Sequence, residues 1–388
     1  MAINHSNRNP KHVVAIGTGY QMLDSLLVAM IQLQGEGLIT VVAVVDINTE
    51  AARRAAERFG IPSHYSSIAE MLAAEPTVGA AVVATPNRFH AENAIELIDA
   101  GVHVLVEKPL ASTVRGGRDM VQAAEERGLV LCCDYQYPQQ IRGARSPIEE
   151  GRLGEINLIE ARWLRRDGIP QKHFWQDRRS GGVLVDLGVH LLSAVLYLVG
   201  TAPTLVSAIG HNQVGRGLHG DDFRGADSVS LTLGWPELRA QAQVHTSWAA
   251  AIGPEDIIGI DVWGSKGVLH VPMMGAGLDV DAYRPTLYEH RLVDAAEAEK
   301  RVLHVPTGGD KAFVTETTQL EPPIDTERCF AVNIAEFIRA CLGEGELLFP
   351  AGLALDIARI CSAGVHSAEH GGRQVDLENE DDPGAAVD

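Results

Sequence analysis

The chain has 388 residues, of which 46% are hydrophobic, and 51 acidic against 32 basic residues give it a formal net charge of −19. This length predicts a globular protein of two domains, and the acidic balance disfavours binding to nucleic acid or to an anionic membrane. The amino-terminal stretch has no apolar export signal, the longest apolar run is interrupted by Asp186 and His190, and five cysteines without CxxC spacing favour free thiols. We therefore expect a cytoplasmic protein.

The first third of the chain alternates strands and helices. Near-continuous apolar strands are expected at residues 13–16, 39–46, 78–86, 102–109 and 129–135, with helices at 22–34, 49–60, 91–100 and 114–128 between them. Buried strands joined by helices predict a parallel sheet covered on both faces. We expect an α/β, doubly wound Rossmann-like domain over residues 1–134, with 1–10 disordered.

From residue 135 the pattern changes to short strands of alternating polarity. After a helix at 139–151, a strand at 154–165 and a helix at 183–198, strands are expected at 204–211, 227–235, 237–248, 257–264 and 267–272. Helices at 329–342 and 351–368 close the pattern. We expect a second, α+β domain over 135–376 with a large, mainly antiparallel open sheet, followed by an acidic disordered tail at 377–388.

A glycine turn, "VVAIGTGYQM", follows the first strand. Gly17 permits the tight turn, and Gly19 lets backbone N–H groups approach a pyrophosphate at the helix start, but Met22 stands where the dinucleotide fingerprint has a third small residue. Asp46 closes the second strand, where a carboxylate accepts hydrogen bonds from an adenosine ribose and repels a 2′-phosphate. NAD is therefore expected rather than NADP; the alternative is that Asp46 only supports a turn.

Two polar segments follow the third and fourth strands. The segment "ATPNRFH", residues 84–90, lies at the sheet edge where such folds bind ligands, although Asn87 as a helix cap is an equal alternative. The segment "VEKP", residues 106–109, places Lys108 at the same edge, where a lysine polarises a hydroxyl group. A surface lysine is the alternative interpretation.

The segment "SGGVLVDLGVH" begins an apolar helix. Asp186 and His190 are four residues apart and share one helix face, as a general base with a neighbouring carboxylate would. Asp186 or His190 alone would be interpreted as a buried polar residue whose hydrogen bonds are satisfied within the core. The same pair could hold a metal, but we find no third ligand at suitable spacing and expect none; the polar loop with His211, His219, Asp221 and Asp222 has no recognised metal spacing.

These motifs resemble those of the Gfo/Idh/MocA oxidoreductases, the glucose-fructose oxidoreductase and inositol dehydrogenase family. The resemblance spans residues 11–376 and rests on "AIGTGY", "VVDIN", "ATPNRFH", "EKPLA", "EEGRLGEI", "GGVLVDLGVH" and "GSKGVL". It implies NAD-dependent oxidation of a secondary alcohol on a sugar, amino sugar or cyclitol. It also implies that His190 takes the hydroxyl proton, that Lys108 orients the oxygen, that Asp186 tunes the pair, and that a homodimer or homotetramer forms through the second-domain sheet.

The expected site divides into two sets. Around the cofactor we expect Gly17, Gly19, Tyr20, Gln21, Met22, Asp46, Thr85, Pro86, Asn87, His90, Glu107, Lys108, Gln136 and Trp175. Around the substrate we expect Lys108, Arg162, Trp163, Arg165, Asp186 and His190, although the basic residues after 161 would equally suit a solvated loop.

The chain departs from the family pattern at three places. Met22 replaces a glycine, Ser193 stands where an aspartate is frequent, and residues 138–140 lack a frequent arginine. Two alternative functions follow: a keto-sugar reductase, which would use the same residues in reverse, and a non-catalytic NAD-binding sensor or scaffold. The catalytic set of Lys108, Asp186 and His190 argues against the second.

Overall fold

The computed structural model describes residues 8–166, 168, 182–212, 214–250, 256–273, 283–294, 304–306 and 311–379. Within these ranges the chain forms two compact units, unit 1 with residues 8–139 and 326–362 and unit 2 with 140–325 and 363–379. Residues 326–362 therefore belong with unit 1, whereas the sequence had assigned them to the second domain. The amphipathic pattern of a helix shows that it packs on a core, but not on which one.

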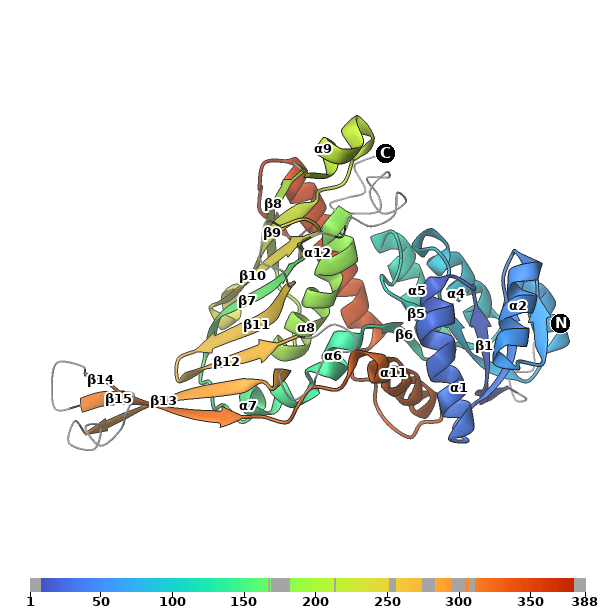
Figure 1. The fold of residues 1–388 in the computed structure, drawn as a ribbon, viewed down its shortest axis with the longest axis horizontal. Coiled ribbons are helices and arrows are strands. Elements are labelled where there is room, and N and C mark those ends of the chain that lie inside the picture. Colours follow the sequence, from blue (N-terminus) through green and yellow to red (C-terminus); the bar gives the residue numbers. More distant parts are fainter. Residues whose placement is uncertain are drawn as a thin grey trace. The chain divides into compact units, whose positions relative to one another are not determined.

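Unit 1 is built on a parallel sheet of six described strands in the order β3-β2-β1-β4-β5-β6. Figure 1 labels β1, β5 and β6 of this sheet. This order confirms the doubly wound Rossmann-like fold. The sheet begins earlier than expected, because β1 starts within the segment expected to be disordered and the Asn9 N–H donates to Thr77 O at 2.9 Å. The strands are β1 Asn9–Ile16, β2 Thr40–Val45, β3 Ser63–Tyr65, β4 Val78–Val83, β5 His103–Glu107 and β6 Leu131–Asp134.

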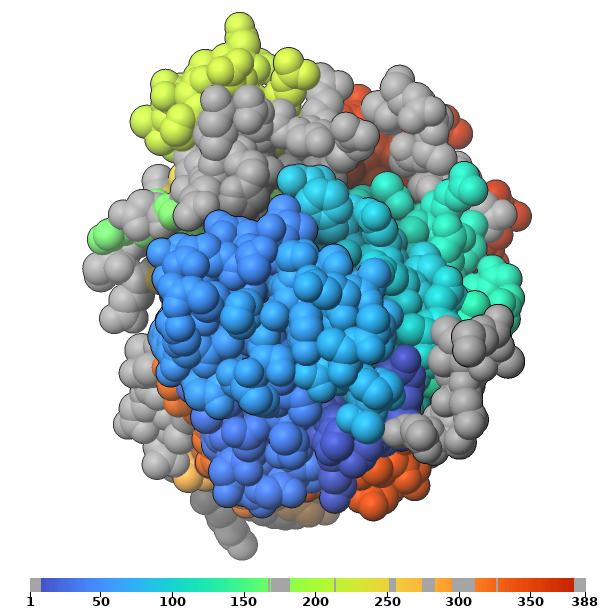
Figure 2. Space-filling view, turned by 90° about the vertical axis from the view of Figure 1, so that its right-hand side faces the viewer, coloured from blue at the N-terminus to red at the C-terminus, as the bar shows by residue number. Residues whose placement is uncertain are grey.

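Helices cover both faces of this sheet. Apolar residues of α1, α2 and α11 share one core with alternate residues of β1, β2, β4 and β5, while α4 and α5 pack together near β5 and β6. In Figure 2 the residues around α2, drawn in blue, form a continuous outer surface of the unit. The helices are α1 Leu27–Gly35, α2 Thr49–Phe59, α3 Ile68–Ala74, α4 His90–Asp99, α5 Val114–Arg127 and α11 Thr326–Cys341.

Unit 2 is built on a sheet of ten described strands in the order β14-β15-β13-β12-β11-β7-β10-β9-β8-β16. Its neighbours are antiparallel except β7 and β10, which run parallel, so the expected large, mainly antiparallel sheet is confirmed. Helix α8, Val189–Val199, packs on β7 and β10. The strands are β7 Ile156–Leu164, β8 Leu205–His211, β9 Ser228–Trp235, β10 Ala240–Ser247, β11 Ile257–Gly264, β12 Gly267–Pro272, β13 Thr286–Asp294, β14 His304–Pro306, β15 Lys311–Gln319 and β16 Val375–Asp376.

Several segments differ from the sequence prediction; among them, β3, α3, β14 and β16 were not expected. The helix expected at 139–151 is broken into α6 Gln136–Gln140, a 3-10 turn and α7 Ser146–Glu149, because Pro147 lacks an N–H and so suits only the first turn of a new helix. Strands β13 and β15 were not expected. Leu377, which the sequence predicts to lie in the disordered tail, is 4% exposed and donates its N–H to Thr204 O at 2.8 Å. Residues 380–388 lie outside the described ranges.

Helix α12, Ala351–Glu369, is the last helix of the described chain. Within the described ranges, no helix is both long enough and apolar enough to cross a bilayer. The sequence predicts free thiols, and the structure has all five cysteines free, four of them buried.

Candidate active site

The glycine turn lies at the carboxyl end of β1, in the middle of the parallel sheet. Gly17 has φ +93°, and a Cβ at this position would lie 2.8 Å from Ala84 O, so the turn requires glycine. At Gly19 an added Cβ would meet no atom within 4 Å, which leaves the backbone open on that side. By helix geometry, the first N–H groups of a helix lack acceptors within it, so the start of the following helix suits an anion.

Asp46 is hydrogen-bonded to the glycine turn. Its Oδ2 accepts from the Thr18 N–H at 2.8 Å and from the Thr18 hydroxyl at 2.7 Å, while Oδ1 accepts from the Asn48 N–H at 2.8 Å. Asp46 therefore supports a turn, as one interpretation of the sequence predicts, and it lies directly after β2. The next residue, Ile47, is 93% exposed and carries no charge.

Met22 is completely buried in the core that the first helix shares with the sheet. The helix opens with a π turn, Met22–Leu26, in which the Leu27 N–H donates to Met22 O. Such turns are rare in proteins as a whole, but those that occur are often found at functional sites. Tyr20, at the tip of the turn, is 80% exposed, and Gln21 caps the π turn without a side-chain hydrogen bond.

The segment after β4 is held by His90. Its Nδ1 lies 2.8 Å from Pro109 O and its Nε2 lies 2.8 Å from Thr85 O, and the side chain is buried. Burial lowers the pKa of His90, and the contacts with backbone groups oppose this shift. His90 thus joins the ends of β4 and β5 rather than presenting a ring nitrogen at the edge.

Pro86 and Asn87 form the loop before α4. Asn87 begins a 3-10 turn, Asn87–Phe89, and the residue that caps α4 is Phe89, which makes no side-chain cap hydrogen bond. The alternative of Asn87 as the cap of this helix is therefore wrong. Pro86 is exposed and Asn87 half-buried.

Lys108 is half-buried immediately after β5. The residue before it, Glu107, is 6% exposed and pairs in register with Asp134 at the end of β6. Gln136 is also buried, and its Nε2 lies 3.4 Å from Asp134 Oδ2. Unit 1 therefore brings Gly17, Asp46, Thr85 and Lys108 to one edge of its sheet, as the sequence predicted, because parallel strands end on the same side.

Asp186 and His190 occupy the start of the helix in unit 2. Asp186 lies in a π turn, Leu184–Gly188, and His190 lies in the first turn of α8. Asp186 Oδ2 accepts from Trp248 Nε1 at 2.9 Å, and Trp248 is completely buried. Gly182, with φ +59°, precedes the helix, and a Cβ there would lie 2.8 Å from Ala226 O.

Trp163 lies beside His190, with ring centroids 5.6 Å apart. The guanidinium group of Arg165 lies 5.1 Å from the centroid of the Trp163 ring. Arg162, by contrast, forms an ion pair with Asp261, and alternate residues of a strand point to opposite faces. The structure therefore brings Trp163 and Arg165 together near His190 but turns Arg162 to the other face of the sheet, so its expected place at the substrate is not supported.

Other predicted residues have less to add. Trp175 lies outside the described residues, as do Ser180 and Gly181 of the double-glycine motif. Ser193 is fully buried, and its hydroxyl donates to His190 O at 2.7 Å. Among the described residues no group of three or more His, Cys, Asp or Glu side chains is arranged to hold a metal ion.

Two family models match the chain. Residues 11–135 match the model described as "Oxidoreductase family, NAD-binding Rossmann fold", and residues 141–270 match the "GFO/IDH/MocA C-terminal domain". The 1,5-anhydro-D-fructose reductase of Ensifer adhaerens is 32% identical over 237 residues, which cover 59% of this chain and 67% of that protein. The chain belongs to the Gfo/Idh/MocA oxidoreductase family.

Other members of the Gfo/Idh/MocA family are similar over shorter regions. D-glucoside 3-dehydrogenase of Escherichia coli (strain K12) is 34% identical over 209 residues, 53% of this chain and 58% of that protein. The chain thus covers less than two thirds of that relative. Among solved structures, levoglucosan dehydrogenase in complex with NADH and levoglucosan is similar with a TM-score of 0.74 at 22% identity. The match covers 94% of this chain and 99% of the levoglucosan dehydrogenase chain. At that identity the likeness establishes the fold.

Three residues that contact the predicted site residues were not predicted from the sequence. Thr18 binds Asp46, Trp248 binds Asp186, and Asp134 pairs with Glu107. Only Asp134 had a signal, since it follows a buried apolar strand as Glu107 does. Trp248 is 62 residues from Asp186 along the chain, so no local pattern connects the two.

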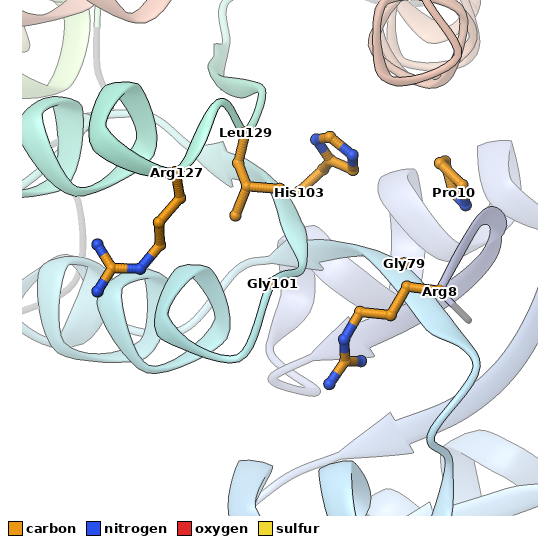
Figure 3. A pocket seen from close by; sticks show the side chains of 7 residues that line it. All are labelled: Arg8, Pro10, Gly79, Gly101, His103, Arg127 and Leu129. Atoms are coloured by element: carbon orange, nitrogen blue, oxygen red, sulfur yellow. The ribbon is translucent and has the colours of Figure 1, made fainter. Parts of the chain in front are cut away.

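A cavity of about 170 Å³ lies at the opposite edge of the parallel sheet, near the starts of β1, β4 and β5. Figure 3 shows the guanidinium groups of Arg8 and Arg127 directed away from the His103 ring. Arg8 donates to Val78 O at 2.6 Å, and Arg127 pairs with Asp99 at 2.6 Å. These cations therefore do not converge on a common point, and the cavity is separate from the candidate site.

Proposed function

We propose that this Gfo/Idh/MocA family member is an NAD-dependent dehydrogenase that oxidises a secondary alcohol of a sugar, amino sugar or cyclitol. The observation that carries the proposal most directly is the environment of Asp186 and His190. The two residues lie at the start of one helix, Asp186 is anchored by the buried Trp248, and His190 lies against an aromatic ring. A fixed carboxylate and histidine of this kind suit general acid–base chemistry on a hydroxyl.

The residues of unit 1 fit a dinucleotide. A side chain at Gly17 would collide with Ala84 O, whereas the space beside Gly19 is open, as the approach of a pyrophosphate to the backbone requires. Asp46, Thr85 and Lys108 end neighbouring strands of the same sheet. We infer that Gly17, Gly19, Tyr20, Gln21 and Asp46 hold the nucleotide, and that Thr85, Pro86 and Asn87 line the edge beside it.

The nicotinamide supplies the hydride acceptor when the cofactor is bound. In the proposed reaction His190 takes the proton of the substrate hydroxyl, and Lys108 orients and polarises that oxygen. Asp186, held by Trp248, stabilises the charge that His190 gains. Such proton transfer by a positioned side chain accelerates a reaction by about 10²–10⁴-fold.

The substrate class is proposed from two observations. Relatives similar to this chain are named D-glucoside 3-dehydrogenase and levoglucosan dehydrogenase. Beside His190 the chain presents Trp163, with Arg165 over its ring, and an aromatic face with an adjacent cation suits the apolar face and hydroxyls of a sugar ring.

The decisive experiment is an absorbance screen at the NADH band over sugars, amino sugars and inositols, each with NAD⁺ and with NADP⁺. We expect reduction of NAD⁺ by at least one class of polyol. If the protein binds NADH yet reduces no cofactor across this panel, the dehydrogenase proposal fails and a non-catalytic NAD-binding role replaces it.

A keto-sugar reductase is the second candidate, because one relative is named a 1,5-anhydro-D-fructose reductase. The same residues serve both directions, with His190 returning the proton. Oxidation of NADH by keto sugars, measured beside the forward screen, tells which direction has the higher kcat/KM.

Asp46→Ala is expected to raise the KM for NAD⁺ about tenfold or more, since a hydrogen bond to a charged group contributes about 1.5–3 kcal/mol. It should also narrow the preference for NAD⁺ over NADP⁺, because the carboxylate no longer repels a 2′-phosphate. Steady-state kinetics with both cofactors measure this. If the ratio of kcat/KM for NAD⁺ to kcat/KM for NADP⁺ stays unchanged, Asp46 is not the residue that selects the cofactor.

Thr18→Val is the matched control for that variant. It removes the hydroxyl that donates to Asp46 Oδ2 but leaves the carboxylate in place. We expect a smaller loss of NAD⁺ affinity and an unchanged cofactor ratio. If Thr18→Val narrows the ratio as much as Asp46→Ala does, Asp46 acts by shaping the turn and not by its charge.

We also propose that copies of the chain associate through the face of the unit 2 sheet that carries Arg162. Tyr288, Leu292 and Phe313 are exposed large hydrophobic residues on its outer strands, at 38%, 52% and 43%. Light scattering should give the mass of a dimer or tetramer. Leu292→Asp should reduce that mass by placing a charge in the interface; a monomeric wild-type protein would contradict the proposal.

A further inference from the structure

Two buried carboxyl groups lie on neighbouring strands at the ends of β5 and β6. Glu107 and Asp134 are register partners, with exposed fractions of 6% and 0%. Asp134 has hydrogen-bond donors: its Oδ1 accepts from Asn333 Nδ2 at 2.6 Å, and Gln136 Nε2 lies 3.4 Å from Oδ2. Glu107 Oε1, by contrast, is buried without a hydrogen-bond partner among the described residues.

Two ionised carboxylates at these buried positions would repel each other with little screening by solvent. Burial together with the charge of Asp134 raises the pKa of Glu107 to about 8. Burial also raises the pKa of Asp134, to about 6, while hydrogen bonds from Asn333 and Gln136 oppose the rise. The donors around Asp134 favour its ionised form, so at pH 7 the pair carries one negative charge, and Glu107 keeps its proton.

We propose that Glu107 and Asp134 share a single proton at neutral pH and that this protonated pair positions Lys108. A protonated Glu107 is able to donate to the Asp134 carboxylate on the next strand, which satisfies an otherwise unpaired buried group. The link to the lysine is direct, because Lys108 follows Glu107 in the chain and its backbone N–H and charge favour the ionised Glu107, which lowers the pKa of that carboxyl group. Only the catalytic role of Lys108 in this inference rests on the proposed function.

Helix α11 fixes the other side of the pair. Asn333 donates both to Asp134 and to Tyr135 O, the latter at 3.2 Å, and Gln139 donates to Glu336 of the same helix. The titratable groups that interact with the pair include Lys108, Cys132, Cys133 and Tyr135. Burial raises the pKa values of the Cys133 thiol and the Tyr135 hydroxyl, so both stay neutral when Glu107 ionises. Loss of the shared proton then places two negative charges beside the Lys108 amide.

The first test measures stability and needs no substrate. A carboxyl group whose pKa is raised in the folded protein binds its proton more tightly than in the unfolded chain, so stability falls as the pH rises toward and through about 8. We expect the midpoint of urea unfolding to fall between about pH 6 and about pH 9 in the wild type. The Glu107→Gln side chain keeps the shape of glutamate but cannot ionise. In this variant the midpoint of urea unfolding should fall clearly less over the same pH range.

Glu125→Gln is the matched control, since Glu125 is an exposed carboxyl of the same unit. It should show the same pH-dependent fall as the wild type. Asp134→Asn provides a second variant: without the Asp134 charge, Glu107 loses one cause of its raised pKa, and the fall should shift to lower pH. If both Glu107→Gln and Asp134→Asn fall as the wild type does, the shared proton is excluded.

The second test measures the positioning of Lys108, with a substrate identified by the screen. Above the pKa of the pair, kcat of the wild type should fall about tenfold per pH unit while the KM for NAD⁺ changes little. Glu107→Gln should remove or displace this alkaline fall. An alkaline fall that persists unchanged in Glu107→Gln assigns it to another group and overturns the positioning role, whereas a protein without dehydrogenase activity leaves the stability test to decide the shared proton.

Discussion

Lys108→Ala is expected to lower kcat by about 10²–10⁴-fold, the usual contribution of a group that assists proton transfer. NADH binding should be kept, because the residues proposed to hold the nucleotide lie after β1, β2 and β4, whereas Lys108 follows β5. Stopped-flow or steady-state kinetics give kcat, and NADH fluorescence gives the affinity. A fall in kcat with intact binding places Lys108 in the chemical step.

Lys11→Ala is the control for that variant, since Lys11 is an exposed lysine of the same unit. Its kcat and NADH affinity should match the wild type. Full activity in Lys108→Ala would remove the proposed mechanism, and an equal loss in both variants would point to a general effect of lowering the positive charge of unit 1.

Gly17→Ala is expected to destabilise unit 1 by about 2–5 kcal/mol. An L-residue in a left-handed conformation costs about 1–2 kcal/mol, and the added Cβ, 2.8 Å from Ala84 O, forces β1 and β4 apart at an overpacking cost of about 1–3 kcal/mol. Urea unfolding followed by circular dichroism measures the loss, and cofactor binding should fall with it. A midpoint equal to that of the wild type would show that the turn does not need glycine.

Gly19→Ala separates the two glycines. Its Cβ meets no atom within 4 Å, and its φ is not in the left-handed region, so stability should change little. NADH affinity should nevertheless fall, because the methyl group occupies the side on which we propose that the pyrophosphate approaches. Unchanged affinity in Gly19→Ala would argue against this position for the cofactor.

Local patterns in the sequence were sufficient for much of unit 1. The buried strands, the glycine turn and Lys108 were all predicted, because the period of hydrophobic residues reports burial and because parallel strands bring their carboxyl ends to one edge. The same holds for Asp186 and His190, whose spacing places them at the start of one helix. Strands β13 and β15 were missed, since their sequences, "TLYEHRLVD" and "KAFVTETTQ", are largely polar.

The fold class, the family and the residue types of the candidate site thus follow from the amino-acid sequence. Three features depend on the folded structure: the core that α11 joins, the turn of Arg162 away from His190, and the position of Asp134 beside Glu107 and Asn333. Asn333 and Asp134 are 199 residues apart. Contacts at such separation depend on strand order and on which face of a sheet each helix covers, and neither property is recorded in the local periodicity of the chain.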